Sequence, residues 1–218
     1  MRRNFHNSQR QDASALNLGN EWNEGWKNCV FDIVWKAYDR LKAYYKSKNV
    51  EPKDEIEDDI TFALLRNADI VKNFYPANFR KVKIYNQPPD KSKERNRKRN
   101  TNDIGVFFGD EIEKSEFIFE SKKISTLTVN GIGSYKEDLD AYLEEYYGSH
   151  LAESSLIAYL HKGTTVEFFA LVEKVIKRKL KQFSLFPSRP HKTSEHKKTV
   201  ANAKNPKFLC HHLIFEMQ

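Results

Sequence analysis

The stretch FIFESKKI, residues 117–124, decides which fold the surrounding chain can form. Its first residues are apolar, and Glu120 and Lys122 then follow two positions apart. Because neighbouring side chains of a β-strand point to opposite faces, residues two positions apart share a face. We therefore predict a largely buried strand with one face that presents a carboxylate and an ammonium group beside Ile118 and Ile124. The opposite face, with two phenylalanines, can pack under a helix.

Two more strands are predicted upstream. Apolar residues recur with a period of two over 79–85, and 104–108 forms a second apolar strand. The run at 90–102 has no apolar residue, so we interpret it as a loop. The connection at 109–114 is short, which favours an antiparallel hairpin between the second and third strands.

Helical periodicity surrounds these strands. The predicted helices cover 21–48, 52–73, 134–146 and 166–183, and two further strands cover 156–160 and 207–217. The third and fourth helices begin with the spacing of a capping box, Ser134 with Glu137 and Thr164 with Glu167.

The order of these elements predicts an α/β fold with a mixed central sheet flanked by helices. We expect a single domain over 1–218. Its parts are a mobile N-terminus (1–18), an N-terminal helix (19–50), a core (51–160) and a C-terminal extension (161–218), with mobile loops at 88–101 and 184–205.

The composition suits a globular protein. The chain has 218 residues, of which 39% are hydrophobic, so it can bury a sizeable core. Its net charge of +7 fits a polyanionic partner such as nucleic acid. No window approaches the roughly 20 apolar residues of a membrane span, and the first twenty residues lack a signal-peptide core. With two distant cysteines, which fit a reducing compartment, we expect a cytoplasmic protein with no membrane partner.

An acidic residue stands close to the charged strand in the predicted sheet. Asp103 opens the second strand, and pairing around the 109–114 turn brings it opposite residues 120–125. Asp103, Glu120 and Lys122 can then meet at one edge of the sheet. Carboxylate oxygens are preferred ligands of Mg²⁺, which can activate a water and stabilise charge on a phosphoryl group. A nearby lysine can orient that water or neutralise the phosphate.

Asp103 and, after sixteen intervening residues, Glu120-Ser121-Lys122 resemble the D…(D/E)-x-K signature of the PD-(D/E)XK nuclease superfamily. The resemblance covers 52–160, about half of the chain. It implies a restriction-endonuclease-like core, αβββαβ, to which this chain adds an N-terminal helix and a C-terminal helix plus strand. One departure is Asn102, which stands where the family pattern has proline.

The resemblance also implies roles for individual residues. Asp103 and Glu120 would bind the metal together with the backbone carbonyl of Ser121, and Lys122 would position or activate the attacking water. Many members use a further glutamate from the first core helix. Glu57 is the candidate here, and Glu55 and Asp59 are the alternatives.

From this resemblance we expect a DNA endonuclease of restriction or anti-phage type that uses Mg²⁺, with Mn²⁺ as a substitute. Cutting both DNA strands at once requires two such sites, so a homodimer or a complex with a partner protein is expected. The aromatic helix at 21–48 could supply the contact. Two alternatives stay open. One is a catalytically inactive nucleic-acid-binding scaffold subunit of the same fold, and the other is a nuclease effector directed at RNA.

The candidate residues also have simpler explanations. Glu120 and Lys122 fit the solvated edge of a sheet. Asp103 fits a turn residue, and Glu57 fits a capping box with Asp54.

The basic run at 91–99 is a candidate arm for phosphate contacts. Its cationic side chains are Lys91, Lys93, Arg95, Arg97, Lys98 and Arg99. Contacts of this kind are sensitive to salt and independent of sequence. A solvated loop is the alternative, and the basic faces of 166–183 and 188–204 could extend the same footprint.

The C-terminal half contains a group of potential zinc ligands: His191, His196, Cys210, His211 and His212. They lack the spacing of a zinc site. We therefore predict histidines that are hydrogen-bonded within a strand.

Overall fold

The computed structural model describes residues 9–76, 82–86, 104–108, 117–145, 151–201, 203 and 206–218. Asp103, the basic run at 91–99 and the predicted mobile loop at 88–101 lie outside the described residues. In the part of the chain that is described, no helix is long and apolar enough to cross a membrane.

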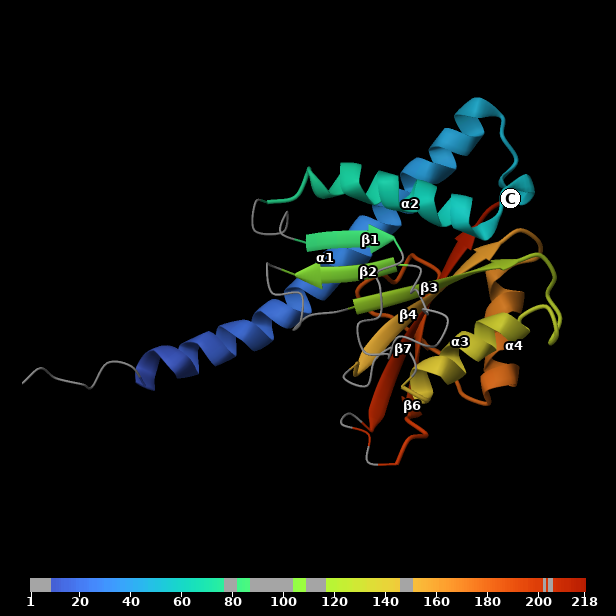
Figure 1. Cartoon of the computed structure of the whole chain (residues 1–218). Helices are drawn as coiled ribbons and strands as arrows, with labels where there is room; N and C mark the ends of the chain where they lie inside the picture. Colours follow the sequence, from blue (N-terminus) through green and yellow to red (C-terminus); the bar gives the residue numbers. More distant parts are fainter. Residues whose placement is uncertain are drawn as a thin grey trace, which may run out of the picture.

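A seven-stranded mixed sheet forms the centre of the molecule (Figure 1). Its strands are β1 (Val82–Asn86), β2 (Ile104–Phe108), β3 (Phe117–Ile124), β4 (Glu153–Leu160), β5 (Lys181–Gln182), β6 (His191–Lys197) and β7 (Lys207–Glu216). They are arranged in the order β1-β2-β3-β4-β7-β6-β5. The first three strands form an antiparallel meander, whereas β4 is parallel to both β3 and β7. The predicted antiparallel neighbours are therefore confirmed.

Helices cover both faces of this sheet, which confirms the predicted α/β class. They are α1 (Gln9–Lys48), α2 (Glu57–Lys72), α3 (Gly133–Leu143) and α4 (Thr165–Ile176), with a short 3₁₀ turn η1 (Pro52–Asp54) before α2. In β3, Phe117 and Phe119 join the core beneath α1 and α2. Ile118 and Ile124 of the same strand join the core beneath α3 and α4. The alternation read from FIFESKKI thus places one strand between two apolar layers.

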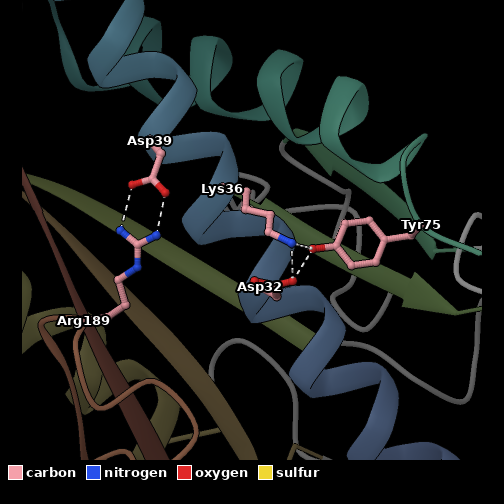
Figure 2. A network of polar contacts seen from close by, with 5 residues as sticks. All are labelled: Asp32, Lys36, Asp39, Tyr75 and Arg189. Atoms are coloured by element: carbon pink, nitrogen blue, oxygen red, sulfur yellow. Dashed lines mark hydrogen bonds and ion pairs between the residues drawn. The ribbon is translucent and has the colours of Figure 1, made fainter.

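The helices α1 and α2 pack side by side and are joined near both ends. Near one end, the Tyr75 hydroxyl donates to Asp32, and Lys36 Nζ lies 2.8 Å from Asp32 Oδ2 and 3.0 Å from the Tyr75 hydroxyl (Figure 2). Near the other end, the Tyr45 hydroxyl donates to Glu55. Because the middle of α1 meets the end of α2 and the late part of α1 meets the turn before α2, the two helices are antiparallel.

The helix α1 begins earlier than the sequence pattern indicated. We expected a mobile segment over 1–18 and a helix from Glu21, but α1 already starts at Gln9. The stretch 9–18 includes alanine and leucine and no proline, which is compatible with a helix. Its polar, aperiodic composition hid the helix from a search for apolar periodicity.

The predicted mobile loop at 184–205 is wrong in its central part, which forms β6. This strand is antiparallel to β7, and its buried residues are polar, so it shows no apolar alternation. Arg189, just before β6, donates to both carboxylate oxygens of Asp39 in α1 (Figure 2). One of these bonds measures 2.7 Å.

The ends of α3 and α4 also differ from the prediction. α4 ends at Ile176 rather than near residue 183, because Lys177 adopts a left-handed conformation with φ of 54°. The capping box at Thr164 is present as predicted. The one predicted at Ser134 is not formed, since α3 begins one residue earlier, at Gly133, and Ile132 precedes it.

Candidate active site

Lys122 lies between two carboxylates that come from different helices. Its Nζ is 3.4 Å from Oε1 of Glu57, the first residue of α2, and 3.2 Å from Oδ2 of Asp138 in α3. The Lys122, Glu57 and Asp138 side chains are 22%, 28% and 11% exposed, so salt screens these contacts less than it screens surface pairs. The cluster therefore connects β3 with one helix from each layer.

The carboxylate of Glu57 is directed at the strand and not at its own helix end. Its Oε2 accepts a hydrogen bond from the backbone N–H of Lys123 at 2.6 Å. Ile56 is the residue before α2, and it provides no side-chain cap. Asp54 belongs to the preceding η1 turn. The capping-box explanation of Glu57 is thus wrong, and the structure brings this residue to Lys122.

The two alternatives to Glu57 are placed differently. Glu55 accepts from the Tyr45 hydroxyl, and its backbone carbonyl accepts from Lys123 Nζ at 2.6 Å. Asp59 is exposed. Beside Lys123, burial and then the lysine charge lower the pKa of His161 to about 4, so that this imidazole is neutral at pH 7.

Glu120 is a buried residue of an interior strand. It is 3% exposed, and β3 lies between β2 and β4, so the explanation as a solvated sheet edge is wrong. Ser121 points to the opposite face, where its Oγ lies 2.9 Å from the Thr61 hydroxyl. That hydroxyl is in turn 3.0 Å from the hydroxyl of Tyr159. These contacts connect the backbone beside Glu120 to α2 and β4.

Asp138 is a member of the cluster that the sequence reading missed. It lies on the buried face of α3 together with Tyr135, Leu139 and Tyr142. Positions 135, 138, 139 and 142 follow the helical repeat. The sequence did contain a sign of this role, a carboxylate inside an otherwise apolar stripe of the helix. Such a group is rarely buried without a partner.

The meeting of Asp103 with Glu120 stays a prediction, since Asp103 lies outside the described residues. β2 begins at the next residue, Ile104, which pairs with Phe119. Among the residues that the structure describes, no group of three or more His, Cys, Asp or Glu side chains is arranged to hold a metal ion. Within this part, the predicted donors are the Glu120 carboxylate and the Ser121 carbonyl.

The strand histidines are buried and hydrogen-bonded, as predicted. The hydrogen bonds join His212 to Tyr135 at 2.9 Å and to Ser194 at 2.7 Å, His196 to Ser194 at 2.6 Å, and His191 to His211 at 3.0 Å. Cys210 is buried and free. These residues hold β6 and α3 against β7.

Comparisons of this chain with protein-family models, with curated proteins and with solved structures find no match.

Proposed function

We propose that this chain is a metal-dependent nuclease that hydrolyses phosphodiester bonds in DNA, of the restriction or anti-phage type. The observation that supports it best is the approach of Glu57 to Lys122 at 3.4 Å. These residues are 65 positions apart, and the resemblance implies both of them, Glu57 from the first core helix and Lys122 from the Glu-x-Lys strand.

The order and pairing of the elements support the same proposal. The sequence of elements from α2 to β4 is helix, antiparallel three-stranded meander, helix and a strand parallel to β3. This is the order expected of a restriction-endonuclease-like core. Under this proposal α1 and the segment from α4 to β7 are additions to that core.

Chain connectivity supports a place for Asp103 in the same site. Ile104 is opposite Phe119; Glu120 follows Phe119 in β3, and Asp103 precedes Ile104 in the sequence. A trans peptide keeps consecutive Cα atoms about 3.8 Å apart, so Asp103 cannot be far from the end of β2. Two carboxylates on neighbouring strands are the set that Mg²⁺ commonly uses, with waters and phosphate oxygens filling its remaining positions.

The proposed chemistry assigns a task to each residue. A bound Mg²⁺ lowers the pKa of a water ligand and stabilises negative charge on the phosphoryl oxygens. Glu120, Asp103 and the Ser121 carbonyl hold the ion. Lys122 orients the attacking water, and Glu57 and Asp138 fix the position of the lysine Nζ.

The test is a cleavage assay on duplex DNA, single-stranded DNA and RNA, each with Mg²⁺ and with Mn²⁺. Wild type should cut duplex DNA, whereas Asp103→Ala, Glu120→Ala and Lys122→Ala should lose about 100-fold or more of the rate, as for groups that act on the transition state. Glu195→Ala is the matched control, because Glu195 forms an exposed pair with Lys181. Full activity of Glu120→Ala contradicts the proposal. Preferential cleavage of RNA would show that RNA, and not DNA, is the substrate.

A second candidate is an inactive nucleic-acid-binding scaffold of the same fold. The engagement of Lys122 by two carboxylates favours it, because this ammonium group is already neutralised in the structure. Binding of duplex DNA with no cleavage under either metal supports this candidate against the nuclease.

A further inference from the structure

A groove runs between α1 and α2, on the outer side of this helix pair. Its volume is about 760 Å³. The wall from α1 includes Arg40, Tyr44 and Ser47, and the wall from α2 includes Arg66, Asn67 and Ile70. None of the described residues that line it is acidic.

The exposed groups of the groove are of two kinds. Tyr44 and Ile70 are 53% and 44% exposed, which leaves an aromatic ring and an apolar side chain in contact with water. Arg40 and Arg66 provide one positive charge on each wall, and within the described chain neither has a carboxylate partner. The Arg66 guanidinium instead lies 5.6 Å from the centre of the Phe62 ring.

The walls of the groove are held in place near both ends. Tyr75 bonds to Asp32 and Lys36 beyond one end (Figure 2), and Tyr45, within the α1 segment that forms one wall, bonds to Glu55 just before α2. The spacing of the two helices is therefore set before any ligand arrives, and a preformed site loses less entropy on binding.

We propose that this groove binds a single strand of nucleic acid, with phosphates at Arg40 and Arg66 and a base stacked on Tyr44. Positive charges on both walls, with no acidic residue in the described lining, fit a phosphate backbone, and aromatic rings fit bases of any sequence. The exposed ring of Tyr44 can stack on an unpaired base, whereas the bases of a duplex are already stacked on one another, which favours a single strand.

The groove is also close to the candidate active site. Arg66 follows Glu57 by nine positions in α2, which corresponds to about 14 Å along the helix axis. A strand in the groove would thus be within a few nucleotides of Lys122. The binding itself does not depend on cleavage, so it goes beyond the proposed nuclease activity.

The experiment is fluorescence anisotropy with a short fluorescein-labelled oligothymidylate, in EDTA so that cleavage does not occur. The double variant Arg40→Ala/Arg66→Ala should weaken binding at least about tenfold and reduce the slope of log affinity against log salt by about 1 to 2. Tyr44→Ala should weaken binding at least about fivefold, whereas Tyr44→Phe should bind as wild type does, because stacking needs only the ring.

The matched control is Lys162→Ala/Lys207→Ala, which removes two exposed charges that do not line the groove. This variant should change the affinity for the oligonucleotide by no more than about twofold, because salt screens charges that lie far from the binding site. Unchanged binding by Arg40→Ala/Arg66→Ala, or an equal loss in the control, overturns the proposal. Binding of a polyglutamate peptide in the groove without binding of the oligonucleotide also overturns it, in favour of an acidic protein partner.

The experiments distinguish an error in the proposed nuclease activity from an error in the proposed nucleic-acid binding by the groove. Glu120→Ala should abolish cleavage and retain oligonucleotide binding if both proposals hold. Groove-dependent binding by a wild-type protein that never cleaves leaves this inference standing and contradicts only the nuclease.

Discussion

The Glu57 carboxylate accepts a hydrogen bond from the backbone N–H of Lys123 at 2.6 Å, and this bond attaches the first turn of α2 to β3. A negative charge in the first turn also interacts favourably with the helix dipole. One side chain therefore stabilises a helix, holds that helix on the sheet and contacts Lys122. Its loss should affect stability and the candidate site together.

Replacing Glu57 tests this arrangement. Glu57→Ala should lower the free energy of unfolding by about 1–3 kcal/mol, because the Lys123 N–H loses a charged acceptor in a partly buried place. Asp58→Ala is the control in urea denaturation, since Asp58 is an exposed carboxylate of the same turn. Both variants lose the dipole term, so their difference measures the bond to β3. Equal losses in the two variants contradict the proposed attachment.

The ion pair between Lys122 and Asp138 should be energetically coupled. A double-mutant cycle with Lys122→Met and Asp138→Asn should give a coupling of about 1–3 kcal/mol in unfolding, as expected for contacting groups that are mostly buried. The pair Lys181 and Glu195 is the control, with side chains 73% and 72% exposed. That cycle should give no more than about 0.5 kcal/mol. Indistinguishable couplings would place Asp138 outside the cluster.

Asp138 should also act on the proposed reaction by positioning Lys122. Asp138→Asn should lower kcat about tenfold with little change in KM, because it displaces the lysine Nζ without touching the groups that bind the substrate. Asp138→Glu should restore part of the rate, since it returns a carboxylate to the same place. A change confined to KM argues against a positioning role. Steady-state cleavage kinetics provide the measurement.

The stability of the protein should fall as the pH drops below about 6.5, the usual pKa of histidine. Burial lowers the pKa of His191 to about 2 and that of His212 to about 3. In this range the unfolded chain binds more protons than the folded one, so acid favours unfolding. Each such histidine adds a slope of about 1.4 kcal/mol per pH unit below pH 6.5 and none well above it.

Urea denaturation between pH 8 and pH 5 measures this slope, because carboxylates titrate mainly below that window. His212→Asn should reduce the slope, although it also lowers stability at every pH by removing the bonds to Tyr135 and Ser194. A stability that stays flat down to pH 5 contradicts neutral buried histidines.

The Thr61 hydroxyl should stabilise the backbone beside Glu120. Thr61→Val leaves the buried hydroxyls of Ser121 and Tyr159 without this partner and should cost about 1–3 kcal/mol. Thr61→Ser retains the hydroxyl and should lose clearly less. Thermal unfolding of the two variants distinguishes the hydrogen bond from the loss of a methyl group, and an equal shift in both would assign the effect to packing.

Local patterns in the chain were sufficient for much of the fold. The alternation in FIFESKKI correctly separated Phe119 from Ile118 and Ile124, because the period of a strand is a property of its own backbone. The capping box at Thr164 was equally local, since it joins residues three apart. Polar segments were predicted wrongly as loops where their polar side chains have hydrogen-bond partners far away in the chain. The strand β6 was missed because its buried residues are polar, and His191 and Ser194 find hydrogen-bond partners on β7.

The residue types at the candidate site, a carboxylate and a lysine on one strand face, were readable from residues 117–124, but their surroundings were not. Which carboxylates reach Lys122 depends on how α2 and α3 pack on the two faces of the sheet. Asp138 is one of several acidic residues in the sequence, and only the packing of α3 against β3 places it beside Lys122. Backbone periodicity depends on a few neighbouring residues, so the sequence alone reveals it. Contacts between layers depend on strand order and on helix packing, which no short segment specifies.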